Sequence, residues 1–167
     1  MQGKDTNSPQ DIRVSGVNHP LKFQLRKGIV TIEMPLPSLS EGCITQVEEG
    51  YLVKLDGIIH LLIRSGKYGI DKCNAFVVCK SEPVEFSVWV REMGTIFDET
   101  ACGTGTYAIG LAKAYKQSKS IEEAIIQPSG ERIIAKVSWD DKKQKPISAS
   151  ISGKVEVLYD GPVSFSV

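Results

Sequence analysis

The sequence CGTGTYAIGLAKAYKQ occupies residues 102–117 and is the segment whose composition most clearly predicts a helix. Residues 104–117 are rich in Ala, Lys and Tyr, and Ile109 and Leu111 mark the apolar side. A glycine-rich turn around Cys102 leads into this segment. Because strand patterns dominate the rest of the chain, the helix is expected to lie at the centre of the fold.

Most of the remaining chain shows the apolar–polar alternation that is typical of β-strands. The sequence predicts one hairpin from residues 21–25 and 29–34 and another from 51–55 and 58–63, across the favoured turn dipeptide Asp56-Gly57. Further strands are expected at residues 12–15, 74–79, 84–91, 133–139, 148–152 and 155–159, with turns at 140–146 and 152–153.

A second, short helix is predicted at residues 120–124, because Ser120 and Glu123 have the spacing of a capping box. Together these elements predict the α+β class. The expected architecture is a curved antiparallel β-sheet or barrel wrapped around one central helix. We expect a single domain over residues 1–167, in which residues 1–11 are flexible.

The charge balance and composition exclude several classes of protein. Twenty Lys and Arg residues balance twenty Asp and Glu residues, so no basic surface for nucleic acid or an anionic membrane is expected. No segment approaches the roughly 20 apolar residues of a membrane helix. The four cysteines are typical of reduced thiols in a cytoplasmic protein, and two histidines at these spacings match no common zinc pattern. Neither a metal nor a cofactor is predicted.

Cys102 is the strongest candidate for chemistry. A thiol at a helix N-terminus lies near outward-pointing N–H groups, which are expected to lower its pKa toward neutrality. The same groups can hold a substrate carboxylate, while Gly103 and Gly105 allow close approach and Thr104 adds a hydroxyl. This combination suits proton abstraction next to a carboxylate. The structural alternative is a small residue at the start of a helix, before an ordinary glycine turn.

The cysteine turn resembles a known catalytic motif. Residues 99–105, ETACGTG, look like the second catalytic-cysteine motif of the diaminopimelate epimerase superfamily, which comprises cofactor-independent amino-acid racemases and epimerases. Residues 73–78 resemble its Asn-containing strand, and His60 lies in a segment similar to its Pro-His strand. Residues 127–131 and 151–157 resemble its C-terminal hairpins, so the likeness extends from about Ile12 to the end of the chain.

The resemblance implies a role for each matched residue. Cys102 would be one of two thiols that serve opposite faces of the substrate α-carbon, with His60 and Glu92 tuning the thiols. The implied substrate-binding residues are Asn74, Gly103, Thr104 and Gly105. Without the resemblance, His60 is more simply a buried core histidine, and Cys73 and Cys79 are small buried groups on one face of a strand.

Two departures from the family refine these expectations. Met93 and Ile58 stand where diaminopimelate epimerases carry the Arg and Asn that hold the distal carboxylate, and residues 14–16 look closer to histidine racemases of opine-type metallophore pathways. The chain also resembles only the C-terminal half of the family, without a second cysteine turn. A homodimer or a separate chain carrying the N-terminal half is therefore expected to supply the other thiol. Diaminopimelate epimerisation and non-catalytic carboxylate binding remain alternatives.

Overall fold

The computed structural model describes residues 6, 8–14, 17–37, 42–48, 50–64, 77–81, 84–90, 93–156 and 161–162. These residues form two six-stranded sheets and one α-helix, α2 (Gly103–Gln117). Sheet A has the order β1 (Gln10–Ile12), β2 (Leu21–Arg26), β3 (Ile29–Glu33), β12 (Lys145–Lys154), β11 (Arg132–Asp140), β10 (Ile121–Ile126). Sheet B has the order β4 (Ile44–Val47), β5 (Gly50–Leu55), β6 (Ile58–Ile63), β7 (Val77–Ser81), β8 (Val84–Val90), β9 (Thr95–Glu99).

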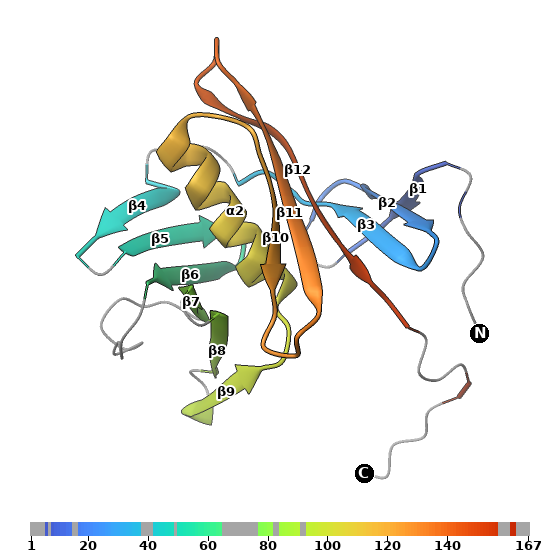
Figure 1. Cartoon of the computed structure of the whole chain (residues 1–167), viewed down its shortest axis with the longest axis horizontal. Coiled ribbons are helices and arrows are strands. Elements are labelled where there is room, and N and C mark those ends of the chain that lie inside the picture. The colour runs from blue at the N-terminus through green and yellow to red at the C-terminus, as the bar shows by residue number, and fades with distance from the viewer. Residues whose placement is uncertain are drawn as a thin grey trace.

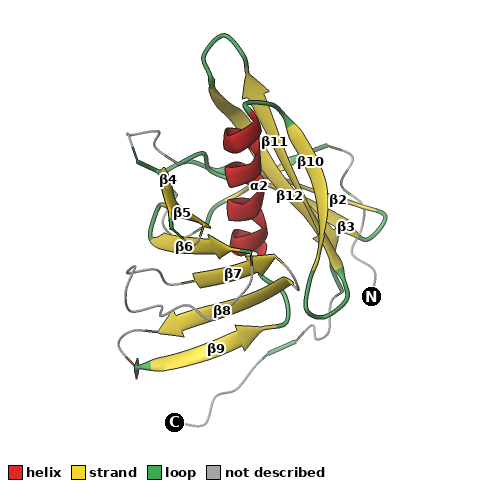
Figure 2. Ribbon diagram, turned by 60° about the vertical axis from the view of Figure 1, so that its left-hand side comes forward, coloured by secondary structure: helices red, strands yellow, loops and turns green. Residues whose placement is uncertain are grey.

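Helix α2 lies between the two sheets, with β10, β11 and β12 on one side and β5, β6 and β7 on the other (Figures 1 and 2). Nine of its fifteen residues are buried, and most of these are small or aliphatic. A helix that is covered on two sides cannot present a broad polar face, which explains its weak amphipathic pattern. The predicted helix and the predicted α+β class are therefore confirmed. Among the described residues no helix has the length and apolarity needed to cross a membrane.

The strand predictions are confirmed for both hairpins and corrected elsewhere. Strands β2 and β3 pair across Lys27 and Gly28, both at positive φ, and β5 and β6 pair across Asp56-Gly57. Strands β4 and β9 are not predicted from the sequence. Among the described strands, the pair β6–β7 is parallel and every other pair is antiparallel, and neither sheet closes into a barrel. Of the strands predicted at residues 74–79 and 84–91, residues 74–76 and 91 lie outside the described residues.

The predicted helix at residues 120–124 is wrong, because this segment is the start of β10. Its side chains alternate in burial, and the strand pairs with β11 along its whole length. The Ser120 hydroxyl does not cap a helix but accepts the Trp139 N–H at 2.9 Å. The capping-box spacing is therefore coincidental here, since pairing with β11 overrides this local signal.

The predicted turn at residues 152–153 is also wrong. Strand β12 runs without interruption to Lys154, and Gly153 lies between Ile133 of β11 and Val30 of β3. A glycine inside a paired strand was mistaken for a turn. Residues 155–156 are not in a strand, and 157–159 lie outside the described residues. Strand β1 begins at Gln10, within the segment expected to be flexible.

Helix α2 approaches sheet A closely at Gly110. A methyl group added there would lie 2.9 Å from Cβ of Ala135, which is fixed to the β11 backbone and cannot rotate away. Alanine normally stabilises an exposed helix by about 1 kcal/mol relative to glycine. Here overpacking, which costs about 1–3 kcal/mol, works against that gain.

We therefore predict that Gly110→Ala lowers the free energy of unfolding by about 1–2 kcal/mol, as measured by denaturant titration. Ala135→Gly removes the methyl group that the new one would strike. The two changes together should cost less than the sum of their separate costs. Additive costs, or a stabilising Gly110→Ala, would contradict the predicted contact.

His60 is the one histidine that the fold buries. It lies in β6 with no exposed surface, and desolvation lowers the pKa of its imidazole from 6.5 to about 4. His19 is exposed and provides a matched control. Below pH 6.5 the unfolded chain binds a proton at residue 60 that the folded chain rejects until about pH 4.

This burial predicts that the stabilising contribution of neutral His60 is complete above pH 6.5 and is lost on acidification toward pH 4. At about 1.4 kcal/mol per pH unit, the loss amounts to roughly 3 kcal/mol. Unfolding measured across this pH range should become less pH-dependent in His60→Gln and remain unchanged in His19→Gln. If unfolding of the wild type, His60→Gln and His19→Gln depended equally on pH, the pH dependence could not be assigned to buried His60.

Candidate active site

Cys102 caps the N-terminus of α2. Its backbone is extended (φ −135°, ψ 105°), and its Sγ accepts the Gly105 N–H at 3.3 Å. A side chain at residue 105 would lie 2.7 Å from the Phe86 ring and 3.1 Å from Cys102 Sγ, so only glycine fits there. The turn therefore needs Gly105 to bring the sulfur onto the helix end. Only 5% of the Cys102 side chain is exposed.

Thr104 joins Cys102 to His60. The Thr104 Oγ1 atom lies 3.6 Å from Cys102 Sγ and 3.2 Å from His60 Nε2. His60 reaches this position from β6, where it is paired with Val53 on one side and Val77 on the other. The structure therefore brings together Cys102, Gly103, Thr104, Gly105 and His60, five of the seven predicted site residues. The other two, Glu92 and Asn74, lie outside the described residues.

The predicted lowering of the Cys102 pKa is not found. Burial raises this pKa above its ordinary value, and the nearby Glu99 carboxylate raises it further. Hydrogen bonds from Thr104 and Gly105 act in the opposite direction but do not compensate. The physical reason is that desolvation of the thiolate outweighs what the helix end provides. The neutral thiol is therefore the resting form at neutral pH.

A buried amide holds the backbone of Cys102 in place. Gln127 Oε1 accepts the Cys102 N–H at 3.0 Å, while Gln127 Nε2 donates to Thr106 Oγ1 at 3.0 Å. Thr106 Oγ1 in turn donates to the Cys102 carbonyl at 2.8 Å. Both side chains are buried, so every bond of this ring is protected from water. This role of Gln127 is not predicted from the sequence, because a glutamine in a polar turn carries no signal of burial.

Glu99 is a second residue that the sequence analysis left without a role. It ends β9 opposite Phe86 of β8, so the two side chains share one face of sheet B. Phe86 packs in the same buried cluster as Cys102, and the Glu99 carboxylate is close enough to raise the pKa of the thiol. The same cluster contains Cys79, which is confirmed as a small buried group, whereas Cys73 lies outside the described residues.

A small cavity of about 110 Å³ opens beside Thr104. Apart from Thr104, its walls are mostly apolar, and Asp56 supplies one carboxylate. The remaining lining residues are Val17, Met34, Pro35, Pro37, Leu55, Ile58 and Tyr107. The hydroxyl of Tyr107 is already committed, because it donates to the Pro35 carbonyl at 2.8 Å. The cavity therefore offers one anionic group to a ligand of modest size.

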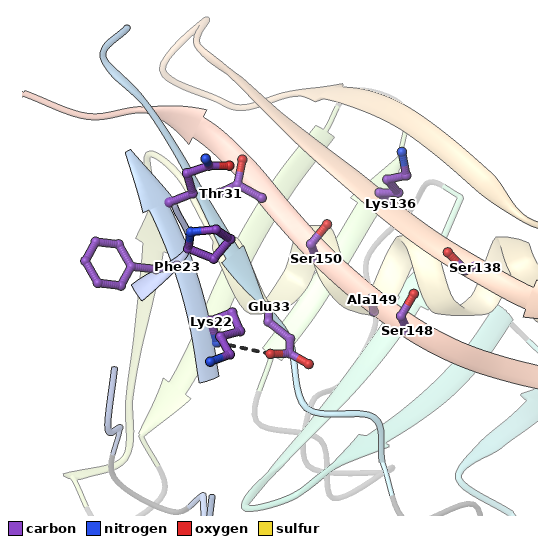
Figure 3. A pocket seen from close by; sticks show the side chains of 11 residues that line it. Lys22, Phe23, Thr31, Glu33, Lys136, Ser138, Ser148, Ala149 and Ser150 are labelled. Carbon is purple, nitrogen blue, oxygen red and sulfur yellow. Dashed lines mark hydrogen bonds between the residues drawn. The ribbon is translucent and has the colours of Figure 1, made fainter. Parts of the chain in front are cut away.

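A larger, open cavity of about 380 Å³ lies on sheet A, and its described lining includes none of the predicted site residues (Figure 3). Its charged side chains already have partners. Lys22 pairs with Asp11, Lys136 pairs with Glu122 at 2.9 Å, and Glu33 accepts the Lys22 N–H at 3.0 Å. No group of three potential metal ligands occurs among the described residues.

Comparison with known proteins identifies the family. The family model described as the histidine racemase CntK N-terminal domain matches residues 79–163, half of the chain, and a search of curated proteins found no match. The match contains Cys102, Glu99 and Gln127 but not His60. The family model describes an N-terminal domain, whereas the cysteine turn resembles a motif of the family's C-terminal half. Which half of the family this chain corresponds to therefore stays a prediction. The chain belongs to the histidine racemase family, whose name implies an isomerase.

Proposed function

We propose that this chain takes part in the racemisation of histidine, without a bound cofactor, through proton transfer at the Cys102 thiol. The observation that carries the proposal is the Cys102–Thr104–His60 contact at the helix end, within a chain of the histidine racemase family. Racemisation requires removal of the α-proton from one face and delivery of a proton to the other. A thiol that is protonated at rest is suited to the delivery step.

The helix end can hold the substrate carboxylate. The first helical N–H groups, those of Gly103 and Thr104, must find partners outside the helix, and the first turn contains no acidic residue. An anion there is also favoured by the helix dipole. A carboxylate bound at this end would bring the α-carbon next to the sulfur that caps it.

The cavity beside Thr104 suits the substrate side chain. Its apolar walls can hold the carbon atoms of an imidazole, and Asp56 can accept a ring N–H. The diaminopimelate alternative is less well supported, because Ile58 lines this cavity and offers no hydrogen bond to a distal carboxylate.

The second acid/base group is proposed to come from another chain. Cys79 is buried in the same cluster as Cys102, and Cys43 is buried as well. Neither thiol is therefore open to the opposite face of a substrate at Cys102. A second copy of this chain or a separate chain with the complementary half would supply the thiol. Two Cys102 thiols that face each other across a two-fold axis would serve both faces.

A second candidate function is carboxylate binding without catalysis. The burial of Cys102 and its raised pKa favour this binding function, because a thiol that takes no part in catalysis does not have to ionise. The two functions differ in proton exchange at the α-carbon, which only the racemase catalyses.

We predict that the protein catalyses deuterium uptake at the α-carbon of histidine in D₂O and that Cys102→Ser lowers the rate at least about 100-fold, in keeping with the 10²–10⁴-fold contribution of a positioned acid or base. Mass spectrometry of the recovered amino acid measures the exchange. Cys43→Ser is the matched control and should retain the wild-type rate.

Protein concentration identifies the source of the second group. With a homodimeric site, the exchange rate per chain should rise with concentration and then reach a plateau. A site completed by a different chain predicts no exchange until that chain is added. Histidine binding that survives Cys102→Ser, without exchange under either condition, would establish the binding function instead.

We also predict that Asp56→Asn weakens histidine binding about 10-fold or more, because a hydrogen bond to a charged group contributes about 1.5–3 kcal/mol. The effect should appear in KM or in the dissociation constant rather than in the exchange rate at saturation. Alanine as the substrate is the control, since it cannot reach Asp56. An equal loss for both amino acids would show that Asp56 does not recognise the side chain.

A further inference from the structure

The orientation of the hydrogen bonds between His60 and Cys102 can be derived from what surrounds the imidazole. His60 Nε2 lies 3.2 Å from Thr104 Oγ1, whereas the buried Nδ1 has no hydrogen-bond partner among the described residues. A neutral imidazole carries its proton on one of the two nitrogens. The position of that proton decides whether His60 donates to Thr104 or accepts from it.

Burial favours a proton on Nε2. A proton on Nδ1 would leave a donor buried without an acceptor, and donors without partners are rarer in proteins than acceptors without partners. A proton on Nε2 is satisfied by Thr104 and leaves only a lone pair of Nδ1 unpaired. His60 therefore donates, and Thr104 Oγ1 accepts.

The orientation of the Thr104 hydroxyl follows from this first bond. Its oxygen accepts from His60, and its single proton is free to point at the next acceptor. That acceptor is Cys102 Sγ at 3.6 Å, within hydrogen-bond distance for sulfur. Gly105 N–H points at the same sulfur from 3.3 Å, so two donors converge on it from α2.

We propose that His60, Thr104 and Cys102 form a one-way donor chain, from Nε2–H to Oγ1–H to Sγ, that stabilises the Cys102 thiolate. His60 acts in it as a fixed donor and not as a base. Thr104 and His60 are positioning residues, and their importance for racemisation rests on the proposed function. The chain itself does not, because it concerns only the state of the thiol.

Other groups face Cys102 from the surrounding strands. Glu99 of β9 raises the pKa of the Cys102 thiol, and Cys79 of β7 is close enough to interact with the thiol electrostatically. When the thiolate forms as the pH rises, the Sγ–H bond breaks and the proton passes to hydroxide or buffer base in the solvent. His60 and Thr104 keep their protons throughout, so the new negative charge lies on the sulfur.

The chain is tested by the pH dependence of Cys102 alkylation with iodoacetamide, followed on the Cys102 peptide by mass spectrometry. Thr104→Val keeps the shape of the side chain but removes the hydroxyl, and should raise the Cys102 midpoint by about one to two pH units. Thr104→Ser restores a hydroxyl and should stay within about half a unit of the wild type. Glu99→Gln should lower the midpoint, since it removes a nearby negative charge.

The variant His60→Gln tests whether His60 acts as a hydrogen-bond donor or as a base. The glutamine amide can donate from the position of Nε2 but cannot take up a proton at neutral pH. A donor chain therefore predicts a midpoint close to that of the wild type. A midpoint that rises as far as in Thr104→Val would overturn the proposal, as would no rise in Thr104→Val itself.

The tautomer of His60 gives a second measurement that needs no variant. Nitrogen-15 NMR of the imidazole in the wild-type protein distinguishes a proton on Nε2 from one on Nδ1. The proposal requires Nε2–H, and an Nδ1–H tautomer would overturn it even if the variants failed to fold. Neither measurement depends on turnover, so a protein with an intact donor chain but no α-carbon exchange would refute the proposed function alone.

Discussion

The fold depends on the burial of one helix between two sheets. Because α2 is covered by β10–β12 on one side and by β5–β7 on the other, its residues must be small wherever the backbones approach, as at Gly110. The same burial extends to its first turn, where Phe86 packs against Gly105. The end of the helix is thus partly covered by the core: Cys102 is buried there, while Gly103 and Thr104 keep some exposed surface. Each unusual property of the thiol follows from this position.

Burial and the helix terminus act on Cys102 in opposite directions. The sequence predicts an activated thiolate, because N–H groups at a helix end stabilise a negative charge. The structure adds the loss of hydration, which is the larger effect here, together with a carboxylate, Glu99, on the same sulfur. What remains is a neutral thiol that has the Thr104 hydroxyl and the Gly105 N–H as hydrogen-bond donors and a carboxylate nearby. Substrate that displaces water or carries its own charge would alter that balance directly.

The elements that could be predicted from sequence are those whose signals are local. Asp56-Gly57 specifies a hairpin, and residues 104–117 specify a helix whatever packs around them. Strand β10 was mistaken for a helix because Ser120 and Glu123 match a local rule, whereas its true partner, β11, becomes apparent only in three dimensions. Gln127 was overlooked for the same reason, since its partners are Cys102 and Thr106, more than twenty residues away along the chain. The contact between His60 and Thr104 spans 44 residues, and only the family resemblance suggested that His60 belonged to the site.

A thiol that is protonated at rest imposes an order on the proposed reaction. The first substrate must lose its α-proton to the second acid/base group on the opposite face. The neutral Cys102 thiol can donate a proton but cannot accept one. Delivery of that proton leaves Cys102 as the thiolate, stabilised by Thr104 and Gly105, and the opposite group protonated. After product release the two acid/base groups have therefore exchanged protonation states. In this form the enzyme is ready to act on the other enantiomer. Such a cycle needs a sulfur whose two charge states are close in free energy, and the opposing effects of burial, Glu99 and the donor chain on Cys102 provide the means to bring them together.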